Sequence, residues 1–404
     1  AALWQWFEEH AETLRPGDVL FVYVTDHGSK NEEDLTDNAI VLWGELLSVN
    51  ELREMLTLLP DGVRVVTVMS QCFSGSFANL MFADGSTAPT GNVCGYFSAT
   101  ADRFAYGCYP ENRDKDNIGH AFRFIEGLAA GSDFASAHRR VLVTDRTPDV
   151  PNRTSDLYLR RLLAREASAS AMSVDALVED LLQIAWKQQV RFRTDLEALD
   201  RMGITFGLDS PRSIIALDHE ARRLRGLIQQ LNAILPRWKA VLLEGKKENV
   251  RRFIATNESW GDRLAPDVVH GLESRERRIL RKYFLEGIVE FTDRDAAARR
   301  LLAVRDRTQK ARAARYRMEV RLGTVLRMRG TLRRIAGRVY LSRHAGDDER
   351  RAFRDLVRCE NLGVHEGRGR DAGELEPLPP PGPPFPPLHD DVQLVEHVQP
   401  GWIG

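Results

Sequence analysis

Lysine, cysteine and long apolar runs are scarce in this chain of 404 residues. Lysine supplies only 8 of the 57 basic residues, and arginine supplies the rest. No run of 18 or more apolar residues occurs, so we expect no membrane-spanning helix and no membrane partner. The apolar share of 43% is still sufficient for a hydrophobic core, and the length allows two or three domains.

The cysteines are too few for a protein that depends on many disulfides. They are Cys72, Cys94, Cys108 and Cys359. If Cys72 is a nucleophile, three remain, which is a poor number for a disulfide framework. The sequence also shows no signal peptide. We therefore expect a reducing, cytoplasmic compartment.

Two short apolar runs each precede a residue that can take part in catalysis. Residues 19–24 (VLFVYV) are followed by Thr-Asp-His-Gly with His27, and residues 63–69 (VRVVTVM) are followed by Ser-Gln-Cys-Phe-Ser-Gly with Cys72. Runs of this kind are typical of buried parallel strands. Reactive groups collect at the carboxyl edge of such sheets, so we expect His27 and Cys72, 45 residues apart, to lie side by side.

A cysteine and a histidine placed together can cleave peptide bonds. The imidazole of His27 can hold the proton that the Cys72 thiol loses when it becomes a nucleophile. The oxyanion that forms needs fixed donors, and the backbone N–H groups of Gly28 and Cys72 are the candidates. Either residue alone is more simply explained as an ordinary histidine or a buried, inert thiol. Their joint placement after two predicted strands favours a cysteine protease.

These two motifs together resemble the caspase-fold cysteine peptidases, which include caspases, metacaspases, legumains and gingipains. The ending Cys72 to Gly75 is closer to legumains and metacaspases than to animal caspases, and residues 38–59 and 96–109 follow the legumain pattern. The resemblance covers residues 1–163. It implies a doubly wound, mostly parallel α/β sheet flanked by helices, and an endopeptidase that needs no cofactor and no metal. It also implies a first strand upstream of residues 19–24, which this sequence does not supply, so we expect a fragment.

The resemblance suggests where the side chain before the cleaved bond would bind. Relatives that prefer a basic or asparagine residue there often carry an acid two positions before the cysteine, whereas this chain has Ser70. Asp102 lies where metacaspases place an aspartate that binds arginine, and a carboxylate can pair bidentately with a guanidinium. Ser98 and Tyr106 complete the expected substrate pocket. A solvated loop position for Asp102 is the alternative, and Asp26 is a weaker candidate for orienting His27.

The rest of the chain reads as helix followed by a proline-rich tail. We expect a helical, arginine-rich domain over residues 164–370 and an extended tail over 371–404. An apolar seam with a 4-3-4-3-4 spacing indicates a helical bundle core, with a dimerising coiled coil as the less favoured reading. Its members are Leu217, Ala221, Leu224, Ile228, Leu231 and Leu235.

Residues 299–343 are strongly basic, with fifteen Arg or Lys against two acids. Three interpretations remain open. The arginines pair with acids elsewhere in the helical bundle, they dock onto a negative surface such as the acidic loop 32–37, or they bind nucleic acid. Nucleic acid is not favoured, because aromatic residues for stacking are sparse.

The sequence therefore predicts a cysteine endopeptidase that cleaves proteins after arginine and is fused to a helical regulatory domain. Activation by an upstream protease, with the missing fragment as a partner chain, fits this prediction. A bacterial defence or cell-death role follows from family analogy alone. The alternative is a catalytically idle scaffold that binds peptides or nucleic acid.

Overall fold

The structure is a computed structural model that describes residues 2–83, 86–108, 119–208, 212–257, 259–362, 384–386 and 391–392. Most of the expected proline-rich tail lies outside these residues. The chain forms two compact units: unit 1 is Ala1–Leu224 with Glu319–Pro387, and unit 2 is Arg225–Met318 with Leu388–Gly404. Each unit is described by itself below. The domain boundaries expected at residues 163 and 370 stay a prediction.

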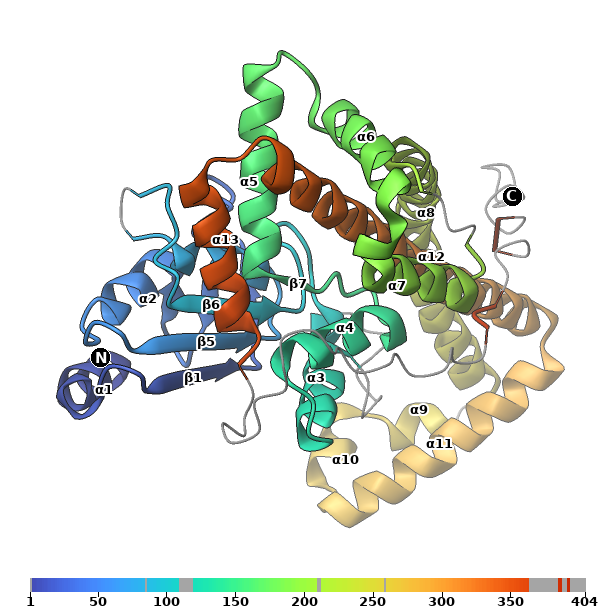
Figure 1. Cartoon of the computed structure of the whole chain (residues 1–404). Coiled ribbons are helices and arrows are strands. Elements are labelled where there is room, and N and C mark those ends of the chain that lie inside the picture. The colour runs from blue at the N-terminus through green and yellow to red at the C-terminus, as the bar shows by residue number, and fades with distance from the viewer. Residues whose placement is uncertain are drawn as a thin grey trace. The chain divides into compact units, whose positions relative to one another are not determined.

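Unit 1 is built on a four-stranded, mostly parallel sheet (Figure 1). Its order is β1 (Val19–Val24), β5 (Arg64–Met69), β6 (Val93–Phe97) and β7 (Asn152–Arg153). The first three strands run parallel and β7 is antiparallel to β6. This arrangement confirms the expected α/β sheet, and β1 is its outer strand among the described residues. The extra strand expected beside β1 stays a prediction.

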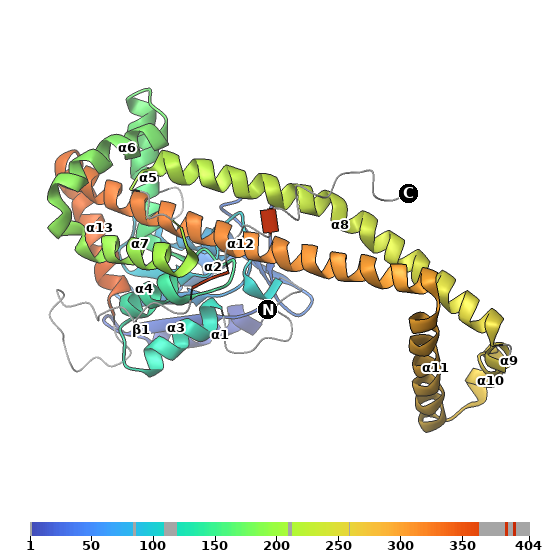
Figure 2. The same cartoon turned by 90° about the vertical axis from the view of Figure 1, so that its right-hand side faces the viewer.

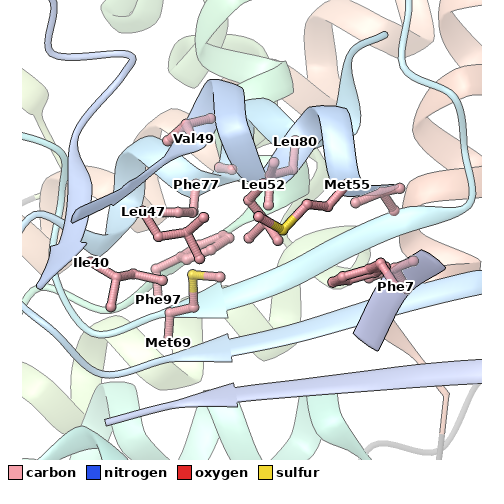
Figure 3. Close-up of a cluster of buried hydrophobic side chains, with 13 residues drawn as sticks. Phe7, Ile40, Leu47, Val49, Leu52, Met55, Met69, Phe77, Leu80 and Phe97 are labelled. Carbon is pink, nitrogen blue, oxygen red and sulfur yellow. The ribbon is translucent and has the colours of Figure 1, made fainter. Parts of the chain in front are cut away.

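Helices cover both faces of the sheet because the strand side chains alternate between two apolar clusters. On one face lie α1 (Ala2–His10), α2 (Val49–Leu56) and the 3₁₀ segment η2 (Ser74–Met81), whose side chains meet Val65 and Met69 (Figure 3). On the other face lie α3 (His120–Ala129), α4 (Phe134–Thr144) and α13 (Asp347–Glu360), whose side chains meet Val66 and Val68. Short 3₁₀ turns, η1 (Ala11–Thr13) and η3 (Tyr106–Cys108), complete the loops.

A small antiparallel sheet follows β1 and leads into α2. It consists of β2 (Gly28–Ser29), β3 (Ala39–Val41) and β4 (Leu46–Ser48). Ser48 caps α2: its Oγ accepts the Glu51 N–H at 3.2 Å, and the Glu51 carboxylate accepts the Ser48 N–H at 2.7 Å. This capping box fixes where α2 begins and so anchors the end of the hairpin.

The remaining helices of unit 1 pack as a bundle. They are α5 (Thr154–Ala169), α6 (Val174–Ala185), η5 (Trp186–Phe192), α7 (Arg193–Phe206), the start of α8 (Ile214–Thr256) and the end of α12 (Ala296–Arg343). Leu217, Ala221 and Leu224 of the predicted seam are buried within the chain itself. They form a helical bundle core, as the favoured reading of the spacing predicted.

The arginines in the second half of α12 pair with acids of unit 1. Arg329 and Arg333 contact Asp175 at 3.3 and 2.7 Å. Arg334 contacts Asp156 at 2.7 Å, and Arg338 contacts Asp195 at 2.8 Å; Arg329 also contacts Asp218 at 3.0 Å. For this half of the basic segment, the first of the three interpretations is confirmed.

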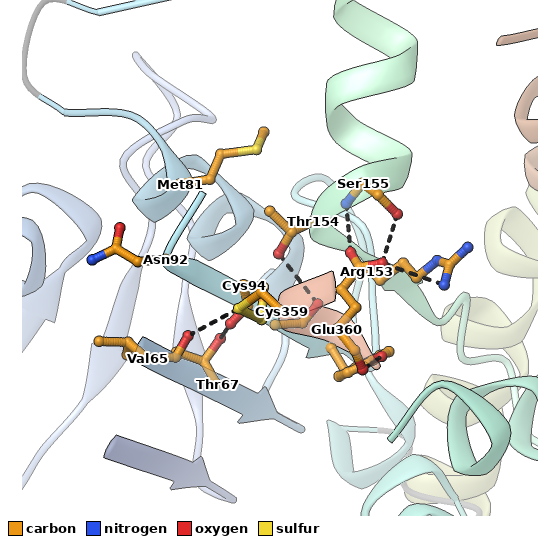
Figure 4. Close-up of a disulfide and its surroundings, with 12 residues drawn as sticks. Val65, Thr67, Met81, Asn92, Cys94, Arg153, Thr154, Ser155, Cys359 and Glu360 are labelled. Atoms are coloured by element: carbon orange, nitrogen blue, oxygen red, sulfur yellow. Dashed lines mark hydrogen bonds and ion pairs between the residues drawn. A yellow bond between two sulfur atoms is a disulfide. The ribbon is translucent and has the colours of Figure 1, made fainter. Parts of the chain in front are cut away.

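A disulfide joins α13 to the central sheet (Figure 4). Cys94 of β6 and Cys359 of α13 are 265 positions apart in sequence, and their Cα atoms are 6.0 Å apart. Glu360 beside it is buried, accepts the N–H and hydroxyl of Ser155 at 2.7 and 2.8 Å, and pairs with Arg153 at 3.3 Å. The sequence did not predict this bond, since three remaining cysteines are a poor number for a disulfide framework and long-range pairing cannot be read from cysteine number.

Unit 2 is a helical hairpin with three further helices at its turn (Figure 2). It contains the second part of α8, the first part of α12, and α9 (Ser259–Arg263), α10 (Pro266–Gly271) and α11 (Ser274–Arg294). Phe253 of α8 contacts the rings of Trp260, Phe284 and Phe291. In the part of the chain that the structure describes, no helix is long and apolar enough to cross a membrane.

Candidate active site

The sheet register brings the histidine and cysteine segments together. Val24 of β1 is the register partner of Met69 of β5, and His27 and Cys72 each lie three positions beyond these partners. The Ser70 N–H donates to the Val24 carbonyl at 2.8 Å, so the two strands stay paired to their ends. The predicted juxtaposition of the two segments therefore exists in the fold.

Gly28 lies directly against the backbone of Cys72. A β-carbon on Gly28 would be 1.9 Å from the Cys72 carbonyl oxygen and 2.8 Å from its carbonyl carbon. No side chain fits in that space, so the sequence requires glycine here for close approach rather than for an unusual φ angle. The N–H groups predicted to stabilise an oxyanion, those of Gly28 and Cys72, thus belong to two backbone segments in contact.

His27 is exposed, and its main chain is fixed on both sides. Its N–H donates to Asp26 Oδ1 at 2.7 Å, and its carbonyl accepts the Val41 N–H at 2.9 Å. The Asp26 carboxylate therefore binds the backbone of His27. The imidazole itself stays accessible to a substrate.

Cys72 is only 2% exposed, and its sulfur is part of a disulfide. The Ala105 N–H also donates to Cys72 Sγ at 3.2 Å. The thiol expected from the sequence is therefore present in its oxidised form. Because a disulfide sulfur is not a nucleophile, this geometry is a closed state that reduction must open before any attack.

The chain turns sharply immediately after Cys72. Phe73 has a φ of 60°, which is uncommon for a residue with a side chain, and its N–H donates to the Arg103 carbonyl at 2.8 Å. Its ring lies 5.1 Å from that of Phe104. This turn ends the path of β5 and starts η2, so it places the cysteine at the corner between strand and helix.

Buried polar side chains hold the cysteine loop from below. Ser98 is fully buried, and its Oγ donates to the Gln71 carbonyl at 3.2 Å. Asn38, also fully buried, donates to the carbonyls of Ala101 and Phe73 at 2.8 and 3.4 Å. Ser98 is thus tied to a backbone carbonyl next to Cys72, and its expected place in a substrate pocket stays a prediction.

Asp102 is exposed. It directly precedes Arg103, whose carbonyl accepts the Phe73 N–H. Its Oδ1 accepts the Thr100 hydroxyl at 2.6 Å, which fixes the carboxylate at the surface of the loop. A carboxylate held in this way, close in sequence to the cysteine contact, can receive a guanidinium, and its role stays a prediction.

Ser70 and Tyr106 are each tied to buried groups that the sequence did not reveal. Ser70 Oγ and His120 Nδ1 are 2.9 Å apart, and the Tyr106 N–H donates to Asp149 Oδ1 at 2.6 Å. No sequence motif marks Asn38, His120 or Asp149, because these residues lie outside the two motifs that follow the predicted strands. Only their residue types, polar and placed near predicted loops, could have drawn attention to them.

Among the residues that the structure describes, no group of three or more His, Cys, Asp or Glu side chains is arranged to hold a metal ion.

Comparison with known proteins agrees with the geometry of this site. Residues 9–133 match the model of the Peptidase C13 family, the legumain family of caspase-like cysteine peptidases. The matched span contains β1, β5, His27 and Cys72. No curated protein and no solved structure matches the chain. The family match supports a cysteine peptidase of the caspase-like clan.

Proposed function

We propose that the chain, whose residues 9–133 match the Peptidase C13 family model, is an endopeptidase with Cys72 as nucleophile and His27 as general acid and base. The observation that carries the proposal is the packing of Gly28 on the Cys72 carbonyl. That contact fixes the cysteine segment against the histidine segment at the carboxyl edge of the sheet. Exposed His27 can then serve a substrate bound over this edge.

The first chemical step is reduction of the Cys72 disulfide. A dithiol supplies two electrons and two protons and becomes a disulfide itself, while the S–S bond breaks and leaves both Cys72 and the sulfur bonded to it as thiols. The thiol then loses its proton to His27 and attacks the scissile carbonyl. The tetrahedral oxyanion accepts N–H bonds from Gly28 and Cys72, a contribution worth about 10²–10³ in rate for each donor.

The intermediate collapses when His27 gives its proton to the leaving amine. The C–N bond breaks and an acyl thioester on Cys72 remains. Water then attacks the thioester while His27 accepts one of its protons, and the carboxylic acid product leaves with the thiol regenerated.

The finer features of this proposal concern specificity and control. Asp102 would bind an arginine before the cleaved bond, with lysine second. The proposal also includes activation by proteolysis, a cytoplasmic setting and a role in bacterial defence. A reducing cytoplasm would favour the thiol form of Cys72.

A peptide library that varies the residue before the scissile bond tests the function. The full chain, treated with a dithiol, should cleave arginine peptides fastest, and Cys72→Ala and His27→Ala should cleave none at a measurable rate. Cleavage by dithiol-treated Cys72→Ala protein at the rate of dithiol-treated wild type would refute the assignment.

The charge of unit 2 supports a second candidate function, nucleic-acid binding. Residues 225–318 contain 22 Lys or Arg against 12 Asp or Glu. Six basic residues in the first part of α12 are exposed, and five of them are Arg299, Arg300, Arg305, Lys310 and Arg312. Aromatic residues are sparse in that segment, with Tyr316 as the one present between residues 299 and 318, so base stacking is not favoured and a duplex backbone would be the ligand.

Salt dependence separates this candidate from a solvated helix surface. Replacing these five residues with Gln should weaken duplex binding and lower the salt slope by about 4 to 5 units. The control replaces Arg351, Arg354 and Arg358, which are exposed on α13. If the wild type binds no duplex at low salt, or if both variants bind equally well, the second candidate fails.

A further inference from the structure

A buried arginine of α12 organises a loop beside the candidate site. Arg327 has no exposed side-chain surface. Its Nε donates to the Asp149 carbonyl at 2.7 Å, its Nη1 to the Asp145 carbonyl at 2.7 Å, and its Nη2 to the Thr147 carbonyl at 2.8 Å. The Asp145 carboxylate lies 3.5 Å from Nη2. One guanidinium therefore fixes the path of residues 145–149.

The planar fork of arginine is what this arrangement requires. Its donors point in several fixed directions in one plane, whereas a lysine ammonium is a single point with three donors. Asp145 further stiffens the loop, because its carboxylate accepts the Thr147 N–H at 3.0 Å and the Thr147 hydroxyl at 2.8 Å. The loop thus has one well-defined conformation as long as Arg327 is present.

The fixed loop presents the Asp149 carboxylate to two other segments. Asp149 is 1% exposed. Oδ1 accepts the Tyr106 N–H at 2.6 Å, and Oδ2 accepts the His120 N–H at 3.3 Å. The residue before Tyr106 is Ala105, whose N–H contacts Cys72 Sγ at 3.2 Å. Asp149 therefore lies one residue away from a direct contact with the nucleophile.

The second segment leads to the substrate pocket. His120 begins α3, is 1% exposed, and contacts Ser70 Oγ through Nδ1 at 2.9 Å. Burial, together with the positive charge of Arg327, lowers the pKa of His120 to about 3. The ring is therefore neutral at working pH and can share one hydrogen bond with Ser70, two positions before Cys72.

We propose that Arg327 and Asp149 are positioning residues of the peptidase site. Arg327 holds residues 145–149, and Asp149 holds Tyr106 near Cys72 and His120 near Ser70. The inference rests on the proposed function, since it assigns these residues to the same site. Through Arg327, helix α12 would thus help to shape the pocket, although it is distant in sequence.

The protonation state of Asp149 should control this arrangement. Burial and the neighbouring Asp145 carboxylate raise the pKa of Asp149 to about 7, against the opposing effects of Arg327 and the N–H groups of Tyr106 and His120. The ionised form can accept at both oxygens. Below its pKa, one oxygen becomes a hydroxyl, so the longer contact to His120 is the one expected to be lost.

Two variants of the full, dithiol-treated chain test the proposal through the pH dependence of kcat/KM. Asp149→Asn should lower kcat/KM for an arginine peptide by about 10-fold or more at alkaline pH and remove the Asp149 inflection near pH 7. Asp145→Asn removes the charge that raises the pKa of Asp149, so it should move the inflection to lower pH. If Asp149 had only a structural role, Asp145→Asn would not shift the pH of this inflection.

The matched control is Arg333→Gln, which removes another α12 ion pair, that with Asp175, without touching residues 145–149. It should leave the pH profile unchanged. Wild-type profiles for both aspartate variants would overturn the proposal, as would the same shift in the control.

Hydrogen exchange distinguishes a failure of the positioning role of Asp149 from a failure of the proposed peptidase function. After correction for intrinsic rates, the amide of His120 should exchange faster in Asp149→Asn and, in the wild type, faster below pH 7 than above it. If the wild type cleaves no peptide yet shows this exchange pattern, the peptidase assignment fails and the positioning contacts stand. Unchanged exchange in Asp149→Asn refutes the positioning role whether or not peptides are cleaved.

Discussion

Gly28 and Cys72 are packed so closely that a β-carbon on the glycine would lie 1.9 Å from the cysteine's carbonyl oxygen. The contact joins the loop after β1 to the loop after β5. It holds the two predicted catalytic segments together through their backbones.

Replacing Gly28 with alanine should therefore disturb the site strongly, although the change adds only one methyl group. The added methyl must push the two loops apart, and a displacement of about 1 Å costs roughly 100-fold in kcat/KM. Peptide hydrolysis measures the effect. Gly226→Ala is the control, because nothing lies within 4 Å of its added β-carbon. Equal activity of both variants would show that the close approach is not required.

Reduction of the Cys72 disulfide should switch the protein from unreactive to reactive. Without a dithiol, a cysteine-selective alkylating reagent should not label Cys72, because the sulfur is already bonded. With a dithiol, labelling should appear and hydrolysis should rise by at least about 100-fold. Mass spectrometry locates the label. Full hydrolysis by protein whose Cys72 remains oxidised would contradict the account.

The disulfide between Cys94 and Cys359 should stabilise the fold rather than take part in catalysis. It closes a long segment of chain between β6 and α13, so its removal should lower the free energy of unfolding by about 2–5 kcal/mol. Denaturant unfolding of Cys94→Ser, Cys359→Ser and the double variant measures this. The three should lose similar amounts, because each removes the same bond. Additive losses would mean that the thiols contribute separately.

Asp102 should set the preference for arginine. Removing one partner of a desolvated carboxylate–guanidinium pair costs about 2–5 kcal/mol, so Asp102→Asn should lower kcat/KM for arginine peptides by roughly 30-fold or more. Peptides with a neutral residue at that position should be cleaved as before. Glu33→Gln changes an exposed acid elsewhere on the same unit and serves as the control. An equal loss for neutral peptides would remove Asp102 from the pocket.

The strand ends could be predicted from the sequence because buried parallel strands have a local signature. The runs at 19–24 and 63–69 became β1 (Val19–Val24) and β5 (Arg64–Met69), and with them the placement of His27 and Cys72. Ser70 and Tyr106 were named as pocket residues from the family resemblance, and their role in substrate binding stays a prediction. These features depend on a few neighbouring residues.

The supporting contacts could not be predicted because they join distant segments. Arg327 meets Asp149 across 178 positions, and Cys94 meets Cys359 across 265. An arginine in a basic helix has no local pattern that separates a buried residue from a solvated one. The burial of Ser98 was missed for a related reason, since its partner is a backbone carbonyl that only the folded loop presents.

Identification of the residue that an arginine-directed electrophile modifies tests the central claim most directly. The dithiol-treated full chain is incubated with a peptidyl acyloxymethyl ketone that carries arginine next to the reactive carbon, and the adduct is mapped by mass spectrometry. We predict one adduct, on Cys72, that forms in step with the loss of hydrolysis and is strongly slowed in His27→Ala. An adduct at another residue with loss of hydrolysis, or full hydrolysis by Cys72→Ala, would contradict the assignment of Cys72 as the nucleophile.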